Sequence, residues 1–173
     1  MDANCHIGIS TKSKLILRDI DLLKKFKDLT VSISINTLDE KFKNDMDNAN
    51  SIRDRINTLK ELHNQGIKTV LFMSPIFPYI TDFKAIIEAT KNYVNEYWFE
   101  NLNLRGSYKK IILDYIKSNY PGIFNEYEKI YLFSDKQYWI DLSFEIEAYC
   151  KQNTIKYLNY FYHDELVKNK RKS

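Results

Sequence analysis

The sequence predicts an α/β protein: a partial (β/α) barrel of the TIM type, followed by a C-terminal helical extension and a last short strand. Three observations favour this fold class. Hydrophobic residues alternate between a period of two and a period near 3.6, as they do in successive βα units. Short polar phrases follow the predicted strands, at the ends where such barrels bind ligands. The composition, 44% hydrophobic and 28% charged residues, is typical of a globular domain.

The expected elements follow one another in a regular order. The predicted strands lie at residues 5–10, 30–36, 68–74, 96–102 and 154–162. The predicted helices lie at residues 19–27, 51–66, from about 82, 107–119, 123–132 and 137–152. We expect residues 1–120 to form the half barrel, and residues 121–173 to form an aromatic-rich helical extension of the same domain.

The strand expected at residues 30–36 alternates strictly between apolar and polar residues. Its two faces hold Val31, Ile33 and Ile35 on one side and Ser32, Ser34 and Asn36 on the other. In a β/α barrel the outward side chains pack under helices, so the apolar set should face the helices. Inward polar groups cost stability unless they meet partners or a ligand, which makes this strand a candidate ligand-binding strand. The alternative is an antiparallel sheet with one face in water.

The next βα unit is delimited by residues with clear local roles. Ser51 is the expected N-cap of a helix, with Asp54 three residues later in a capping-box-like arrangement. Gly66 supplies a left-handed end to that helix. The strand that follows should end at Ser74, because Pro75 has no backbone N–H for a ladder hydrogen bond.

Residues 37–50 form the longest predicted connection, and they follow a strand on the face where barrel chemistry occurs. Charged and amide residues dominate this segment. Two interpretations are equally supported by the sequence: a lid over a ligand, or a solvated excursion on the surface.

Lys12 follows the first predicted strand, where an ammonium group can bind a carboxylate or a phosphate. Taken alone, it is more simply an exposed lysine. Beside Ser34 and Asn36 at the end of the neighbouring strand, it becomes a candidate clamp for a carboxylate. The sequence identifies no catalytic residue, and the three histidines and two cysteines show no metal-ligand spacing.

Several phrases occur in a fixed order along the chain. They are Ser10-Thr11-Lys12-Ser13, Leu17-Arg18-Asp19, Ser32-Ile33-Ser34-Ile35-Asn36-Thr37, Arg55 and Ser74-Pro75-Ile76-Phe77-Pro78. In this order they resemble the C-terminal part of a radical SAM domain of the spore photoproduct lyase-like type, over residues 5 to about 115. The resemblance implies the second half of a radical SAM barrel and S-adenosylmethionine as cofactor. It places Lys12 and Ser34 at the amino-acid end of that cofactor, with Asn36 nearby.

The resemblance also implies a [4Fe–4S] cluster that this chain does not ligate. Family members hold the cluster with a Cys-x-x-x-Cys-x-x-Cys loop, and the cluster cleaves S-adenosylmethionine to a 5′-deoxyadenosyl radical. The chain contains only two cysteines, Cys5 and Cys150, which are interpreted as small buried hydrophobic residues. We therefore expect a truncated or split radical SAM protein that is inactive alone. The alternative is a non-catalytic binding or partner-docking remnant of the barrel.

A half barrel exposes a strand edge and its inward side chains. We therefore expect a second chain that carries the cluster-binding half, or a homo-oligomer. A net charge of +3 gives no general electrostatic argument for nucleic-acid binding. Nucleic acid is expected as a partner only because of the family resemblance. No segment has the length and apolarity of a membrane helix or a secretory signal, so the expected location is the cytoplasm.

Overall fold

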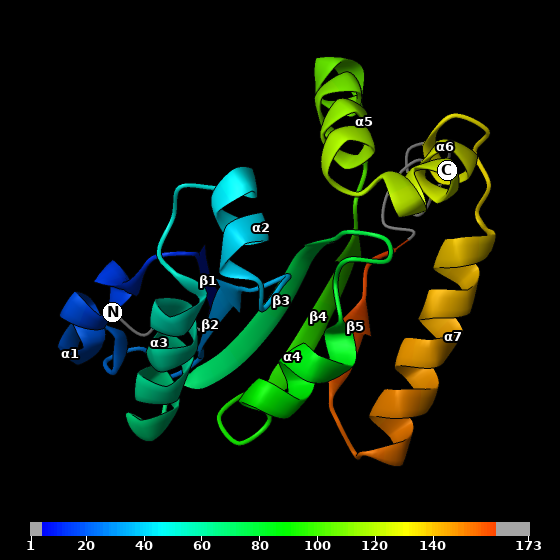
Figure 1. Ribbon diagram of the computed structural model, residues 1–173. Helices are drawn as coiled ribbons and strands as arrows, with labels where there is room; N and C mark the ends of the chain where they lie inside the picture. The colour runs from blue at the N-terminus through cyan, green and yellow to red at the C-terminus, as the bar shows by residue number, and fades with distance from the viewer. Residues whose placement is uncertain (1–4, 162–173) are drawn as a thin grey trace.

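In the computed structural model, which describes residues 5–161, five strands form one parallel sheet with the order β1-β2-β3-β4-β5 (Figure 1). The strands are β1 (Ile7–Thr11), β2 (Leu29–Ser34), β3 (Lys68–Ile76), β4 (Glu96–Asn101) and β5 (Tyr157–Asn159). The helices are α1 (Ile20–Leu23), α2 (Glu40–Met46), α3 (Ile52–Asn64), α4 (Phe83–Thr90), α5 (Gly106–Asn119), α6 (Phe124–Tyr131) and α7 (Gln137–Gln152), and two 3-10 helices are η1 (Lys14–Asp19) and η2 (Pro121–Ile123). The predicted α/β class is confirmed. The antiparallel alternative is wrong, because all four strand pairs are parallel.

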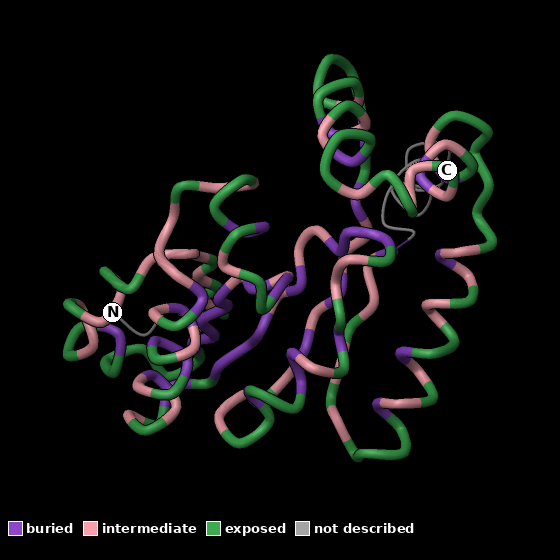
Figure 2. The backbone as a smooth tube through the Cα atoms, viewed as in Figure 1, coloured by how far each residue is buried: buried purple, intermediate pink, exposed green. Residues whose placement is uncertain are grey.

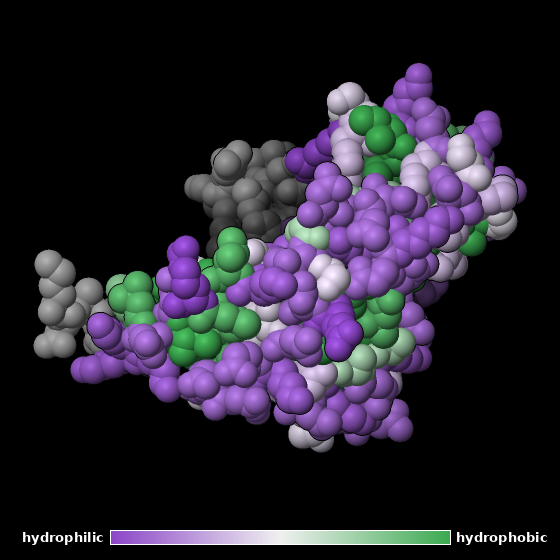
Figure 3. All heavy atoms as spheres, turned by 60° about the vertical axis from the view of Figure 1, so that its left-hand side comes forward, coloured by the Kyte–Doolittle hydropathy of each residue, from purple (hydrophilic) through white to green (hydrophobic). Residues whose placement is uncertain are grey.

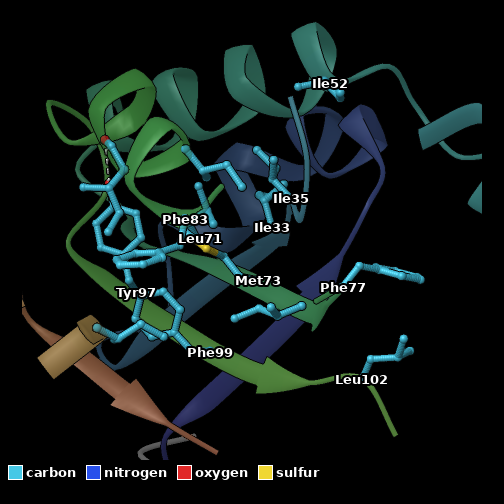
Figure 4. Packing of buried hydrophobic residues seen from close by; sticks show 14 of the residues in the cluster. Ile33, Ile35, Ile52, Leu71, Met73, Phe77, Phe83, Tyr97, Phe99 and Leu102 are labelled. Carbon is cyan, nitrogen blue, oxygen red and sulfur yellow. Dashed lines mark hydrogen bonds between the residues drawn. The ribbon is translucent and has the colours of Figure 1, made fainter. Parts of the chain in front are cut away.

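The helix-facing side of the sheet carries the main core. Val31, Ile33 and Ile35 are buried there, as the alternation predicts. Leu71 and Met73 of β3, and Tyr97 and Phe99 of β4, continue this layer across the sheet (Figure 4). Figure 2 shows the burial concentrated along the sheet and on the helix sides turned toward it. Each apolar row packs under a helix and loses its contact with water, and this burial stabilises the sheet.

The opposite side of the sheet, called here the inner face, has a different composition. Because directly paired residues of parallel strands share a face, the register assigns two rows to it. One row is Ser10, Ser32, Val70 and Glu96, and the next is Ser34, Phe72, Trp98 and Leu158. The inward position predicted for Ser32 and Ser34 is therefore confirmed.

Strand β3 does not end at Ser74. It runs through Pro75 to Ile76, and its pairing with β4 shifts between Met73 and Ile76. The irregular ladder leaves Pro75 without a required N–H bond, and its carbonyl accepts a hydrogen bond from Asn36 Nδ2 at 2.9 Å. The prediction of a stop at Ser74 is wrong because a bulged ladder tolerates a proline.

Residues 37–50 are not one long loop, because they contain α2. Asp39 is its N-cap and accepts hydrogen bonds from the backbone N–H groups of Lys41 and Phe42. The ring of Phe42 is 1% exposed and packs edge-on against Phe77, with centroids 4.9 Å apart. The segment is a packed part of the domain, so the surface-excursion interpretation is wrong.

The other boundaries differ by a few residues from the prediction. Within the helix expected at 19–27 only the short α1 forms, and a 3-10 helix, η1, precedes it. The last strand, expected at 154–162, is β5, and Tyr162 lies outside the described residues. Within residues 5–161, no helix is long and apolar enough to cross a membrane.

The C-terminal helix α7 packs in the same layer as α4. Helix α7 lies beside α4, where Lys84 pairs with Glu145 at 2.6 Å and the rings of Phe83 and Tyr149 lie 5.7 Å apart. Strand β5 then pairs with β4, and the Asn159 amide donates to the Ser143 hydroxyl at 3.0 Å. Residues 121–161 therefore extend the layered structure of the first four strands.

Candidate functional site

The carboxyl ends of β1 and β2 meet at a network of three charged side chains. Asp47 Oδ2 lies 3.0 Å from Lys12 Nζ, and Asp47 Oδ1 lies 2.6 Å from Arg55 Nη2. Arg55 also donates to the backbone oxygen of Asn50 at 2.9 Å and to that of Ser34 at 3.1 Å. These contacts join Lys12, the end of β2 and the segment that leads into α3.

The charges of this network do not cancel. Arg55 is 2% exposed, and Asp47 is the carboxylate that pairs with it. Lys12 shares the same carboxylate, so two cations meet one anion, and the Lys12 side chain is 40% exposed. Because an ammonium group has three N–H donors, Lys12 can hold Asp47 and a further acceptor at once. The network therefore presents one surplus positive charge at the strand ends.

The ionised form of Asp47 is favoured by its neighbours. Burial alone would raise the pKa of this carboxyl, but hydrogen bonds from Lys12, Arg55 and the Ala49 backbone outweigh it and lower the pKa. Asp47 therefore stays negative at neutral pH and fixes the position of Lys12.

The structure places the three predicted site residues, Lys12, Ser34 and Asn36, at this edge of the sheet. The network joins Lys12 to Ser34. Ser34 is tied to Lys12 through Arg55 and Asp47, and its half-buried hydroxyl has no hydrogen-bond partner among residues 5–161. Asn36 is held differently, through its amide bond to Pro75 and through its backbone oxygen, which accepts from Thr81 at 2.8 Å. The arrangement offers an ammonium, a hydroxyl and an amide oxygen to a ligand.

Other residues of the inner face were not found by sequence reasoning. Glu100 ends β4 on this face and accepts a hydrogen bond from the Ser74 hydroxyl. The rings of Phe72, Trp98 and Tyr160 meet beside it. The period-two alternation of Glu96, Trp98 and Glu100 against Tyr97 and Phe99 is the signal that could have found them.

Comparison with known proteins assigns the family. The profile of the Radical SAM superfamily matches residues 1–90, which is more than half of the chain. The chain belongs to the radical SAM superfamily. A radical SAM assignment agrees with the position of Lys12 and Ser34 at the carboxyl ends of parallel strands, the edge where β/α folds place their ligand sites.

Two curated relatives are uncharacterized proteins. One, from Methanocaldococcus jannaschii, is 41% identical over 122 residues, which are 70% of this chain and 46% of the relative. The other, from Acidianus two-tailed virus, is 36% identical over 80 residues, which are 45% of this chain and 27% of the relative. The chain thus spans about half the length, or less, of the curated relatives that it matches.

Solved structures confirm the fold as part of a radical SAM barrel. The crystal structure of Streptococcus suis SuiB bound to S-adenosylmethionine has a TM-score of 0.57 and 18% identity, covering 88% of this chain and 32% of that one. SuiB bound to the precursor peptide SuiA gives a TM-score of 0.55, with 88% and 31% of the two chains covered. The predicted partial TIM-type barrel is confirmed. The spore photoproduct lyase-like subtype stays a prediction.

The residues of this radical SAM chain do not fit an iron–sulfur cluster. Cys150 is buried in α7, and burial raises the pKa of its thiol to about 11, which disfavours the thiolate that a cluster requires. Cys5 is exposed, so its interpretation as a buried residue is wrong. Within the described residues, no group of three or more His, Cys, Asp or Glu could hold a metal ion.

Proposed function

We propose that this chain is the S-adenosylmethionine-binding part of a radical SAM enzyme. The observation that carries the proposal is the Lys12–Asp47–Arg55 network, which presents one surplus positive charge beside the Ser34 hydroxyl. Lys12 and Ser34 are the proposed donors to the α-carboxylate of S-adenosylmethionine. The contact from Lys12 is charge-assisted, so it should be stronger than a neutral hydrogen bond. The Asn36 side-chain oxygen is the proposed acceptor for the α-ammonium group.

The radical SAM family and the S-adenosylmethionine complex of SuiB support this cofactor. When bound to a [4Fe–4S] cluster, S-adenosylmethionine supplies a 5′-deoxyadenosyl radical. The two cysteines of this chain cannot hold that cluster, so we assign no chemical step to these residues. Their proposed role is to bind and orient the amino-acid end of the cofactor.

We propose that the cluster comes from a second polypeptide that docks at β1. Among the described strands, β1 pairs only with β2, so its other edge presents backbone N–H and C=O groups. Leu15 and Leu22, in η1 and α1 beside this strand, are 67% and 55% exposed. Figure 3 shows apolar side chains gathered at the N-terminal end of the molecule. A strand followed by a helix would pair with the edge and cover these side chains.

The same surface supports a second candidate function, a non-catalytic module that docks a partner through β1. In that case the chain would bind the partner but not S-adenosylmethionine. We also propose that the parent enzyme belongs to the spore photoproduct lyase-like lineage, acts on damaged nucleic acid and is located in the cytoplasm. The resemblance of the ordered phrases supports the lineage and the substrate, and the lack of a membrane-like or secretory segment in the sequence supports the location.

Isothermal titration calorimetry of the purified chain with S-adenosylmethionine tests the cofactor site. We expect binding to the wild-type chain, and an affinity at least about tenfold lower in Lys12→Ala, because a charge-assisted contact is worth about 1.5–3 kcal/mol. Ser34→Ala should weaken binding by a smaller factor. Lys14→Ala, which removes a neighbouring lysine paired with Asp54, is the matched control and should bind normally. Absence of binding to the folded wild-type chain would favour the docking module.

A further inference from the structure

Three aromatic side chains form a cluster on the inner face. Phe72 lies in β3, Trp98 in β4, and Tyr160 directly follows β5. Their ring centroids are 5.8 Å apart for Phe72 and Trp98, 6.2 Å for Phe72 and Tyr160, and 6.0 Å for Trp98 and Tyr160. All three side chains are half-buried, and none belongs to the helix-facing core. These rings therefore pack against one another outside the main core and keep part of their surface exposed.

A carboxylate lies next to this cluster. Glu100 follows Trp98 by two residues in the same strand, so it lies on the same face, about 7 Å further along. The pKa of the Tyr160 phenol is raised mainly by burial, and the negative charges of Glu96 and Glu100 raise it further. Its place two residues from Trp98 on the same face of β4 puts Glu100 next to the aromatic cluster.

Glu96 and Glu100, the two acidic residues of this face, differ in whether a cationic side chain pairs with them. Glu96 pairs with Lys68 at 3.4 Å and accepts a hydrogen bond from the Trp98 indole at 3.0 Å. Glu100 accepts a hydrogen bond from the Ser74 hydroxyl, and within residues 5–161 no lysine or arginine forms an ion pair with it. The charge of Glu100 is thus left for a ligand.

A carboxylate beside aromatic faces is the chemistry that recognises an organic cation. The ring faces attract a cation through their quadrupoles, and the carboxylate adds a charge-assisted hydrogen bond. We propose that Glu100, with Phe72, Trp98 and Tyr160, binds an ammonium or guanidinium group of the substrate.

This cation is distinct from those of the cofactor. Lys12 follows β1 and Glu100 lies near the end of β4, so three strand spacings, about 14 Å, separate them across the sheet. If S-adenosylmethionine places its carboxylate at Lys12, its sulfonium stays close to that carboxylate and far from Glu100. The position of the substrate beside the cofactor rests on the proposed function, but the chemistry of the Glu100 site does not.

The test uses argininamide and its neutral ureido analogue, citrullinamide, as probes of the purified chain. Binding is followed by NMR at the indole N–H of Trp98, which Trp98→Phe assigns. We expect argininamide to bind at least fivefold more tightly than citrullinamide. Glu100→Gln should remove this discrimination, whereas Glu96→Gln should keep it. Phe72→Leu, which keeps the Trp98 indole as the reporter, should weaken argininamide binding, and it serves as the second variant if Glu100→Gln does not fold.

Cofactor titrations on the same variants separate this inference from the proposed function. Glu100→Gln should bind S-adenosylmethionine with wild-type affinity, and Lys12→Ala should keep its discrimination between the two probes. Equal binding of argininamide and citrullinamide by the wild-type chain would overturn the inference, as would loss of discrimination in Glu96→Gln to the same extent as in Glu100→Gln. Failure of the chain to bind S-adenosylmethionine would overturn the proposed function and leave the cation site standing.

Discussion

Arg55 shows how a buried cation is tolerated in this domain. A charged group loses its hydration on burial, so its donors need acceptors nearby. Arg55 meets the oxygens of Ser34 at the end of β2, and of Asp47 and Asn50 in the connection between α2 and α3. The side chain therefore fixes the relative positions of the β2 end and the loop that precedes α3.

Removal of the Asp47 carboxylate should leave Arg55 buried with an unpaired charge. We expect Asp47→Ala to lower the free energy of unfolding by about 3 kcal/mol, the cost of breaking a buried ion pair by deleting one partner. Urea unfolding followed by circular dichroism measures this change. Asp54→Ala, which deletes a surface pair with Lys14, should cost less than about 1 kcal/mol. Equal costs for the two variants would contradict the structural role of Asp47.

The same carboxylate predicts a pH dependence. Because the folded-state pKa of Asp47 is lowered, its stabilisation is fully present above the ordinary aspartate pKa of about 4. It is lost as the pH falls through the lower, folded-state pKa. Urea unfolding of the wild-type chain and Asp47→Asn between pH 7 and pH 3 should show their stability difference shrink in acid. A constant difference over this range would contradict the assignment.

At the residue scale, the sequence predicted that Lys12, Ser34 and Asn36 lie at strand ends, but not which residues orient them. Lys12, Ser34 and Asn36 were found because polar residues at strand ends have a known place in β/α folds. The pairing of Asp47 with both Lys12 and Arg55 depends on how residues 37–50 fold, and no local pattern specifies that. Glu100 was missed because polar residues occur on both faces near the end of β4. Only the strand register shows which of them lie on the inner face.

Helix α2 is the element that sequence reasoning missed. Its seven residues contain little apolar periodicity, and an isolated helix of this length is unstable in water. Phe42 supplies the missing stability by packing against Phe77, Tyr115 and Tyr120. The helix exists because of a tertiary contact, which composition alone cannot indicate.

Phe42→Ala should therefore release α2. Loss of a buried ring costs about 3–5 kcal/mol, and we expect a lower free energy of unfolding in that range. Hydrogen exchange of the α2 amides should become faster than that of the α3 amides in the same variant. Leu38→Ala, at an exposed position just before α2, is the control and should change neither quantity. Unchanged exchange in α2 would show that the helix does not depend on Phe42.

The strand prediction was good where two faces differ in polarity, as in β2. The end of β3 was misplaced because a proline rule was applied to a ladder that contains an irregularity. The strand β5 was overextended because Thr154 to Tyr162 is rich in aromatic residues, which are also typical of packed loops. Short edge strands depend on their neighbour more than on their own sequence.

At the scale of the whole molecule, the free edge of β1 and the exposed apolar side chains of η1 and α1 all lie in the N-terminal part of the described chain. We expect the purified chain to self-associate through this surface when no other partner is present. Sedimentation velocity should show a larger species at high concentration, and the double variant Leu15→Glu/Leu22→Glu should shift it to the monomer. The thermal midpoint should stay within a few degrees, since both side chains are exposed.

Leu132→Glu provides a control for that experiment, because Leu132 is also exposed but follows α6, far along the chain from β1. It should leave the sedimentation profile unchanged. A monomeric wild-type chain at all concentrations would argue against the β1 surface as a contact between copies. Association that persists in the double variant would place the contact elsewhere.

The strand order, which equals the chain order, has a consequence for synthesis of the protein. Each new strand needs only the strand made before it, so no pairing waits for a distant part of the chain. The longest connection, residues 102–156, joins β4 to β5, so this last pairing carries the largest loop-closure cost. Each βα unit can thus dock on the growing sheet as it leaves the ribosome, and the edge at β5 is completed last.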